Sequence, residues 1–181
     1  MKPFIFAVNA TSGGGKTTTT RELQKRLPNA RALYFDDRNY DSDSGIEDIV
    51  EWVDNGANVN LWDLKRLADD IDRLKQEYPD FIILDYPFGY KHNLIGPYLN
   101  YSVFIDTPFD IALARRIIRD YDKETMTSIF DDMKYYLEHG RTAYLYGLYD
   151  GRKIADFIVD GSLPLDEIVE CISEKVMDLK N

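Results

Sequence analysis

The stretch that decides the fold is Phe4-Ile-Phe-Ala-Val-Asn-Ala-Thr-Ser-Gly-Gly-Gly-Lys-Thr-Thr-Thr-Thr20. Residues 4–8 form a short apolar run, which is typical of a strand buried on both faces of a sheet. Three consecutive glycines follow, then Lys16, four threonines and a helical pattern over 21–27. A strand, a glycine turn, Lys-Thr and a helix form the context that a phosphate-binding loop requires.

The residue types of this loop suit phosphate chemistry. Glycine lets backbone N–H groups surround a phosphate because no side chain blocks the approach. The first turn of the helix adds free N–H donors and the positive end of the helix dipole. Lys16 is expected to reach the terminal phosphates, and Thr17 to place a hydroxyl on Mg²⁺. The predicted nucleotide-binding residues are Ser12, Gly13, Gly14, Gly15, Lys16, Thr17 and Thr18.

One position departs from the usual pattern Gly-x-x-x-x-Gly-Lys-Ser/Thr. Ala10 stands where the first glycine is expected. The alternative interpretation is a glycine-rich turn that binds nothing. We favour nucleotide binding, because Lys16-Thr17 has the correct offset inside a strand–loop–helix.

Composition limits the class of protein. The 181 residues predict one domain over 1–181, and 44% hydrophobic residues with 13% aromatic ones predict a globular chain. The net charge of −10 argues against a nucleic-acid or anionic-membrane partner. Cys171 is the only cysteine, which excludes an internal disulfide and favours a cytoplasmic location. No run approaches the ~20 apolar residues of a membrane span, and residues 4–8 are too short for a signal sequence.

Apolar strands alternate with helical patterns along the chain. After the first strand, strands are expected over 31–35, 80–85, 101–106 and 155–160. This alternation predicts a mainly parallel five-stranded sheet with helices on both faces, an α/β fold of three layers. Ligands are then expected beyond the carboxyl ends of the strands.

The helical segments carry their own expectations. They are 46–53, 61–78 with Leu61 on its apolar stripe, 109–120, 125–146, and a last helix opened by Pro164. Thr107 is expected to cap the 109–120 helix, with Pro108 at its first position. The expected inward residues of 125–146 are Ile129, Phe130, Met133, Tyr136, Leu137 and Tyr144, and 147–153 is expected to be a loop.

Acidic residues follow two of the strands. The second strand ends at Asp36-Asp37-Arg38-Asn39-Tyr40, where Asp36 or Asp37 is either functional or part of a solvated acidic loop. The third strand closes on Asp85, the Walker B pattern in which a carboxylate holds Mg²⁺ directly or through water. A turn residue at the strand end is the alternative for Asp85. In the following loop, Tyr86 and His92 are candidates for contact with a substrate, although a lone loop histidine is more often a surface residue.

Three arginines lie close together on the 109–120 helix. Arg115, Arg116 and Arg119 fall within about one quarter of the helix circumference at ~100° per residue. Three guanidinium groups on one face suit the clamping of phosphates during transfer. The alternative is salt bridging to the many acidic residues.

The chain resembles the uridine kinase-like group of P-loop small-molecule kinases. Its loop Ala-Thr-Ser-Gly-Gly-Gly-Lys-Thr-Thr is similar to the phosphate loop of that group, and Phe35-Asp-Asp-Arg-Asn-Tyr40 to its second-strand signature. The most specific match is the stretch 103–120, which ends in the Arg-Arg-x-x-Arg-Asp of the family's lid helix. Ala155-Asp-Phe-Ile-Val-Asp160 resembles its last strand, and Trp62-Asp63 a motif that follows the second strand.

The resemblance implies strand order 2-3-1-4-5, ATP as phosphoryl donor, Mg²⁺, and a short helical lid at about 115–128. By matching position, Asp37 would take the proton of the acceptor hydroxyl and Tyr40 would lie beside the acceptor. The three arginines would bracket the transferring phosphate. Arg152 and Lys153 fall where the family places its adenine-side loop.

The chain also departs from the family. The helix that ends near Tyr78 runs almost directly into the third strand, which leaves no room for the β-hairpin that helps to hold the nucleoside. Asp85-Tyr86 replaces the family's Glu-Gly, and Asp120-Tyr-Asp-Lys-Glu124 replaces its Glu-Arg-Gly-Arg run. Kinase chemistry therefore carries over better than specificity for uridine does.

These observations predict ATP- and Mg²⁺-dependent phosphoryl transfer to a hydroxyl of a small acceptor, a nucleoside or a metabolite of similar size. A non-catalytic nucleotide-binding or regulatory protein is the second hypothesis. The net charge disfavours a third, a nucleic-acid-stimulated ATPase. The acceptor and the oligomeric state are left open by the sequence.

Overall fold

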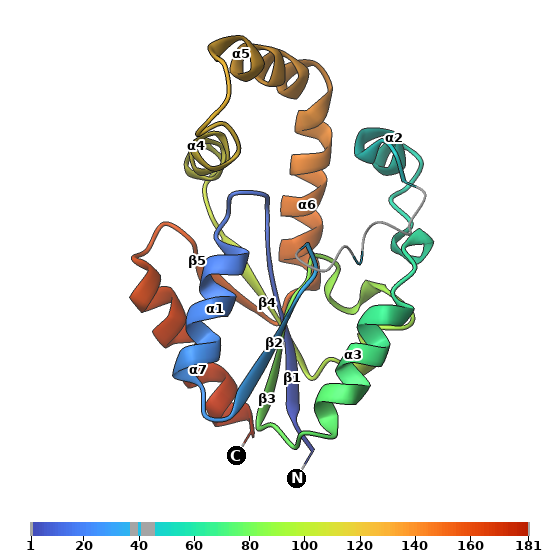
Figure 1. Ribbon diagram of the computed structural model, residues 1–181, viewed down its shortest axis with the longest axis vertical. Helices are drawn as coiled ribbons and strands as arrows, with labels where there is room; N and C mark the ends of the chain where they lie inside the picture. Colours follow the sequence, from blue (N-terminus) through green and yellow to red (C-terminus); the bar gives the residue numbers. More distant parts are fainter. Residues whose placement is uncertain (1, 37–39, 41–45, 181) are drawn as a thin grey trace.

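Five parallel strands form the centre of the molecule (Figure 1). The computed structural model describes residues 2–36, 40 and 46–180. The sheet has the order β2-β3-β1-β4-β5, which confirms the predicted order and the α/β class. The strands are β1 Phe4–Ala10, β2 Ala30–Tyr34, β3 Phe81–Asp85, β4 Tyr101–Asp106 and β5 Phe157–Asp160.

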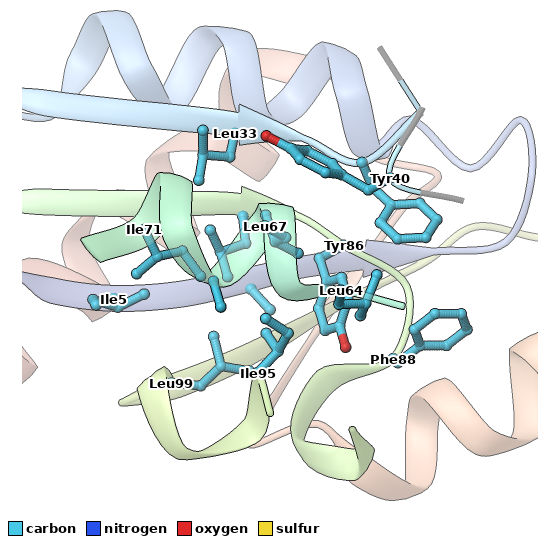
Figure 2. Packing of buried hydrophobic residues seen from close by; sticks show 14 of the residues in the cluster. Ile5, Leu33, Tyr40, Leu64, Leu67, Ile71, Tyr86, Phe88, Ile95 and Leu99 are labelled. Atoms are coloured by element: carbon cyan, nitrogen blue, oxygen red, sulfur yellow. The ribbon is translucent and has the colours of Figure 1, made fainter. Parts of the chain in front are cut away.

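Helices cover both faces of this sheet, as three layers require. Helices α1 (Lys16–Arg26) and α7 (Leu165–Lys180) pack on one face, where Phe6 and Val8 of β1 point. Helix α3 (Lys65–Lys75) packs on the other face, against Ile5 and Ala7. Successive side chains of a strand point to opposite faces, so the continuous apolar run of β1 serves both layers. Figure 2 shows the core on the α3 side.

The remaining helices lie around the carboxyl edge of the sheet (Figure 1). Helix α4 (Phe109–Asp120) follows β4, and helix α5 (Met126–Tyr135) lies farther out. A π-helical segment, Tyr136–Gly140, joins α5 to α6 (Arg141–Ile154), which runs back down to the sheet. Helix α2 (Ile49–Asp54) lies on the other side of α6. Short 3₁₀ turns occur at Val59–Leu61, Gly89–Lys91 and Gly96–Tyr98.

The register of the strands places the expected site residues at one edge. Val8 is opposite Asp85 in the ladder between β1 and β3, so β3 ends close to the end of β1 at Ala10, where the glycine loop begins. The phosphate loop and the acid of β3 therefore meet because of strand pairing, as expected for the carboxyl edge of a parallel sheet.

The helix predicted over 61–78 begins later than its apolar stripe indicated. Leu61 lies in a 3₁₀ turn and is 55% exposed. The Asp63 carboxylate accepts a hydrogen bond from the backbone N–H of Lys65, 3.1 Å away, and the helix starts there. Helix α2 begins at Ile49 instead of Ile46, because Asp48 is its N-cap and accepts hydrogen bonds from the backbone N–H groups of Val50 and Glu51. The N-cap of α3 is Leu64, which makes no capping side-chain bond.

The predicted cap of α4 was wrong. Pro108 is the N-cap residue, without a capping side-chain bond, and the Thr107 hydroxyl instead donates to the Gly14 carbonyl at 2.8 Å. Among the apolar residues of α4, Ala112 is buried, Ile111, Leu113 and Ile117 are partly buried, and Ile118 is 72% exposed. Helix α4 therefore touches the phosphate loop more than the core.

The predicted helix 125–146 and loop 147–153 were wrong in their boundaries. The chain stays helical through α5, the π-helical segment and α6 as far as Ile154. Phe130 and Leu137, which were expected to point inward, are exposed. Gly151 suggested a turn, but a Cβ at this position would lie 2.2 Å from the Phe104 ring. The glycine permits close packing of a helix on the sheet, which local sequence cannot distinguish from a turn.

Within the described part of the chain, none of the helices has the length and the apolar character that crossing a membrane would need.

Candidate active site

The phosphate loop has the backbone geometry that its glycines predict. Gly13 and Gly15 have φ angles of 79° and 96°, a region that favours glycine. The Gly14 N–H donates to the Thr11 carbonyl at 2.8 Å, which closes the turn. A Cβ at Gly14 would lie 2.8 Å from that same carbonyl oxygen. The loop is therefore a tight backbone cradle that side chains at these positions would fill.

Helix α4 and its junction with β4 hold the loop from outside. A Cβ at Gly13 would lie 2.0 Å from the Ala112 carbonyl oxygen, so α4 presses directly on the loop. Thr107 is buried, and its hydroxyl bonds to Gly14 as described above. These contacts link the loop to the helix that carries the arginines.

Lys16 lies between two carboxylates. Its Nζ is 2.5 Å from Asp85 Oδ1 and 3.5 Å from Asp36 Oδ2. Asp85 is 2% exposed, whereas Asp36 is exposed. Asp85 thus lies next to Lys16, at the place where the Walker B interpretation expects an acid. An ammonium, a helix N-terminus, a Thr hydroxyl and two carboxylates fit a triphosphate with its Mg²⁺.

A cavity of about 940 Å³, here called the phosphate cavity, opens above the loop. Helix α4 contributes Arg115 and Arg119 to it, and Asp36 lies at its wall. Arg21, one turn beyond Thr17 on α1, also lines it. Sequence reasoning missed Arg21, although its i+4 spacing from Thr17 was a usable signal. The predicted loop residues that line this cavity are Ser12, Gly13, Gly15, Lys16, Thr17 and Thr18.

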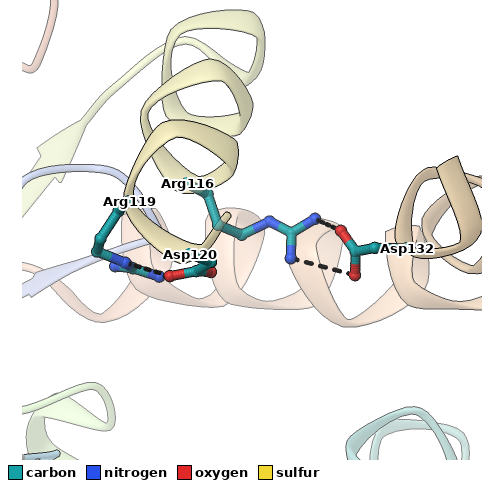
Figure 3. A network of polar contacts seen from close by, with 4 residues as sticks. All are labelled: Arg116, Arg119, Asp120 and Asp132. Carbon is teal, nitrogen blue, oxygen red and sulfur yellow. Dashed lines mark hydrogen bonds and ion pairs between the residues drawn. The ribbon is translucent and has the colours of Figure 1, made fainter. Parts of the chain in front are cut away.

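The arginine cluster of α4 divides in two (Figure 3). Arg116 reaches away to Asp132 on α5, with its guanidinium 5.6 Å from the centre of the Tyr144 ring. Arg119 pairs with its neighbour Asp120 at 2.6 Å. This hydrogen bond lowers the pKa of Asp120. At ~100° per residue, Arg115 and Arg119 are about 40° apart, whereas Arg116 is about 100° from Arg115. That difference turns Arg116 toward α5.

The structure describes three of the four residues expected around the acceptor: Tyr40, Tyr86 and His92. Asp37 is outside the described residues. The Tyr40 hydroxyl donates to Asp70 at 2.6 Å, and His92 Nε2 is 3.0 Å from the Trp62 carbonyl oxygen. Tyr86 is fully buried, and burial raises the pKa of its hydroxyl. Tyr40, Tyr86 and His92 are absent from the described residues that line the phosphate cavity and from those that line a second, smaller cavity beside it.

Arg152 also has a partner of its own. It lies on α6, not in a loop, and its guanidinium makes two hydrogen bonds to Asp106 at 2.7 and 3.0 Å. It is not among the described residues that line the phosphate cavity.

A second cavity of about 330 Å³, here called the ring cavity, lies beside the first. Its aromatic walls come from α2, α6 and the segment after β3. The two cavities share Ala10, Thr11, Ser12 and Pro87. The residues that line the ring cavity alone are Asn9, Ile49, Trp52, Phe88, Ala143, Tyr144, Tyr146, Gly147, Asp150 and Gly151.

Comparison with known proteins supports the same interpretation. No model of a protein family matches the chain. Uridine kinases of Streptococcus uberis and Streptococcus equi subsp. zooepidemicus are 26% and 23% identical to it. Both alignments cover 98% of this chain, with 96% of the first relative and 97% of the second.

Solved structures share the fold at lower identity. A deoxyadenosine kinase from M. mycoides matches with a TM-score of 0.55 and 15% identity, over 97% of this chain and 100% of that one. A gluconokinase from Sinorhizobium meliloti matches with a TM-score of 0.54 and 17% identity, over 98% and 94%. These comparisons bear out the resemblance to P-loop small-molecule kinases, at low identity over nearly the full length of the chain.

The chain is shorter than the relatives it matches. The alignment with the Streptococcus uberis protein spans 202 positions, against the 181 residues of this chain. The relatives therefore carry residues that it lacks, in agreement with the missing hairpin. Residues 76–80 join α3 to β3 without a helix or strand between them.

The ring cavity was not predicted from the sequence. Trp52 was interpreted only as part of a helical pattern, and Tyr144 and Tyr146 as packing residues. About 90 residues separate α2 from α6, and only the folded chain brings their side chains to one cavity.

Proposed function

We propose that this P-loop kinase transfers the terminal phosphoryl group of Mg²⁺-ATP to a hydroxyl of a small acceptor. The observation that carries the proposal is the shared wall of the two cavities: Ala10, Thr11 and Ser12 border both. A donor phosphate above the loop and an acceptor in the ring cavity would meet at this wall. Such adjacency is what phosphoryl transfer needs, because its catalysis rests on positioning and charge stabilisation.

Charged residues in and beside the phosphate cavity have separate roles in this proposal. Lys16 would exchange its carboxylate partners for the β/γ-phosphates, and Thr17 with Asp85 would hold Mg²⁺. Arg115 and Arg119 line the cavity from α4 and would stabilise the charge of the transferring group. ATP bound with Mg²⁺ supplies the phosphoryl group. Asp37 remains our proposal for the residue that accepts the proton of the acceptor hydroxyl.

The acceptor is proposed to occupy the ring cavity. Its walls include Trp52, Phe88 and Tyr146, and aromatic side chains bury planar groups well. The names of the relatives, uridine kinase and deoxyadenosine kinase, favour a nucleoside or a metabolite of similar size.

One observation favours the alternative of a non-catalytic nucleotide-binding protein. Arg116, which matches the family's lid arginines, is held by Asp132 and Tyr144 instead of facing the phosphate cavity. In this alternative, the protein binds ATP but transfers nothing.

Mass-spectrometric detection of phosphorylated product distinguishes the two functions. The protein is incubated with Mg²⁺-ATP and, separately, uridine, deoxyadenosine and gluconate, and ATP binding is measured in parallel by calorimetry. We expect phosphorylation of at least one nucleoside. ATP binding without any phosphorylated product would reject the kinase proposal and support the alternative.

A further inference from the structure

Gly147 lies at the middle of the surface that α6 presents to the ring cavity. Helix α6 contributes Ala143, Tyr144, Tyr146, Gly147, Asp150 and Gly151 to the lining. At ~100° per residue, positions 143 and 151 lie about 40° on either side of position 147. A side chain at position 147 would therefore project into the cavity.

Packing within the protein does not explain this glycine. A Cβ at Gly147 would meet no atom within 4 Å, whereas a Cβ at Gly151 would lie 2.2 Å from the Phe104 ring. Glycine inside a helix is less favourable than alanine, because it loses more conformational freedom on folding. Gly151 has a steric reason to be glycine. At Gly147 the described chain supplies none, so the open space itself needs an explanation.

The surroundings of Gly147 indicate what the space would hold. The Trp52 and Tyr146 rings have centroids 5.6 Å apart at 86°, and Phe88 packs on Trp52 at 6.2 Å. Asp150 is the one charged residue among the described lining residues, and it is already paired with Lys91 at 2.8 Å. The walls thus offer mainly aromatic surface beside bare helix backbone, which suits the flat face of a ring.

We propose that Gly147 is a specificity-determining residue of the acceptor site. The missing side chain leaves room for a planar ring of the acceptor to lie against the backbone of α6. This inference rests on the proposed kinase function and adds the residue that sets the size of its acceptor cavity. The phosphate cavity has no described lining residue from α6, so changes at position 147 leave the donor site intact.

The test compares Gly147→Ala and Gly147→Leu with Tyr149→Ala. Tyr149 is 63% exposed, and position 149 is about 160° from position 147 on the same helix. Both alanine substitutions improve helix propensity, but only the first changes the cavity. Steady-state kinetics are measured with uridine and deoxyadenosine as acceptors, together with the melting temperature and the Kd for ATP.

Gly147→Ala is expected to raise the melting temperature by about 1–4 °C, from the usual gain of alanine over glycine in a helix. It is expected to lower kcat/KM for the acceptor roughly tenfold, and Gly147→Leu at least roughly a hundredfold, because a filled pocket rejects even one extra carbon. The Kd for ATP is expected to stay unchanged. Tyr149→Ala is expected to keep the acceptor kinetics of the parent.

Three outcomes would overturn the inference while the kinase function stands. The first is that Gly147→Leu keeps the acceptor kinetics of the parent. The second is that Gly147→Ala lowers the melting temperature. The third is that either variant loses ATP binding as strongly as it loses kcat/KM for the acceptor. If the parent protein phosphorylates neither nucleoside, the proposed function itself fails with these acceptors, and the inference that rests on it is rejected too.

Discussion

At the scale of single residues, Lys16 is both the proposed phosphate-binding residue and a structural one. Its Nζ pairs at 2.5 Å with Asp85, which is almost completely buried. A buried carboxylate that loses its only nearby cation is strongly destabilising, even where the intact pair adds little net stability. Substituting Lys16 therefore affects folding and nucleotide binding together, and a test must separate the two.

We expect Lys16→Ala to lower the free energy of unfolding by about 3 kcal/mol and to weaken ATP binding, since Asp85 and the phosphates both lose a cation. Adding Asp85→Asn should recover stability but not ATP binding. Chemical denaturation and calorimetry measure the two effects. Lys25→Ala is the control, because its pair with Glu22 at 2.6 Å is exposed and should change stability by less than about 1 kcal/mol. Parental ATP affinity in Lys16→Ala would reject the loop assignment.

Thr107 positions the phosphate loop through one hydrogen bond. Its hydroxyl donates to the Gly14 carbonyl at 2.8 Å in a buried setting. The residue also lies against Gly161, where a Cβ would be 2.0 Å from the Thr107 Oγ1 atom. The hydroxyl is therefore held in place and keeps the Gly14 peptide in the orientation that the cradle needs.

Thr107→Val is expected to cost about 1–3 kcal/mol of unfolding free energy, because the buried Gly14 carbonyl loses its donor. It should also raise the Kd for ATP, and Thr107→Ser should restore both values. Thr20→Val is a matched control: Thr20 is fully buried, and its Oγ1 has no hydrogen-bond partner within the described chain. Equal effects of the two valine substitutions would show that the Thr107 bond does not position the loop.

At the scale of elements, α4 connects the phosphate loop to α5. One side of the helix presses on Gly13 through the Ala112 carbonyl and carries Arg115 and Arg119 toward the phosphate cavity. The other side sends Arg116 to Asp132 (Figure 3). The three arginines thus divide between the proposed chemistry and the attachment of α5.

Arg119→Ala is expected to lower kcat more than it raises the KM for ATP, because a group that stabilises the transition state acts mainly on the chemical step. Arg116→Ala is expected to lower the melting temperature and to increase hydrogen exchange in α5, because the bond to Asp132 is lost. Steady-state kinetics and hydrogen exchange, measured on both variants, test whether Arg119 acts in catalysis and Arg116 in holding α5. Reversed effects would assign the chemistry to Arg116 and the structural role to Arg119.

At the scale of the whole molecule, an acidic chain concentrates cations at one place. The net charge is −10, yet Lys16, Arg21, Arg115 and Arg119 all line the phosphate cavity. They come from α4 and from the start of α1, which follows the phosphate loop at the carboxyl edge of the sheet (Figure 1). A bound triphosphate would therefore link separate parts of the molecule and stabilise the folded state as a unit.

Mg²⁺-ATP at a hundred times its Kd is expected to add about 2.7 kcal/mol of stability by mass action. For a chain of this size that corresponds to a rise of roughly 5–10 °C in melting temperature. Thermal unfolding with and without Mg²⁺-ATP measures the shift, and Lys16→Ala at the same ATP concentration should show a smaller one. An absent shift in the parent would contradict nucleotide binding altogether.

The sequence by itself determined the class of fold and the phosphate loop, and its resemblance to uridine kinase-like kinases implied the strand order. Apolar strands that alternate with helices admit few topologies, and a glycine loop before Lys16-Thr17 is a local backbone requirement. The closeness of Asp85 to the loop also followed, because parallel strands bring their carboxyl ends to one edge. These features depend on the local conformation of the chain, which the periodicity of apolar residues and the spacing of the loop residues predict directly.

The tertiary structure alone decided which side chains face a cavity. Tyr86 and His92 are buried in the core, Arg116 is diverted by Asp132, and Gly147 lies inside a helix where a loop was expected. Each outcome depends on contacts with residues distant in sequence. Gly151 of the same helix is a further example, because it packs against the Phe104 ring. The ring cavity exists only because α2 and α6 lie across from each other. Local propensity describes an element, but contacts between elements determine which of its faces is left open for a ligand.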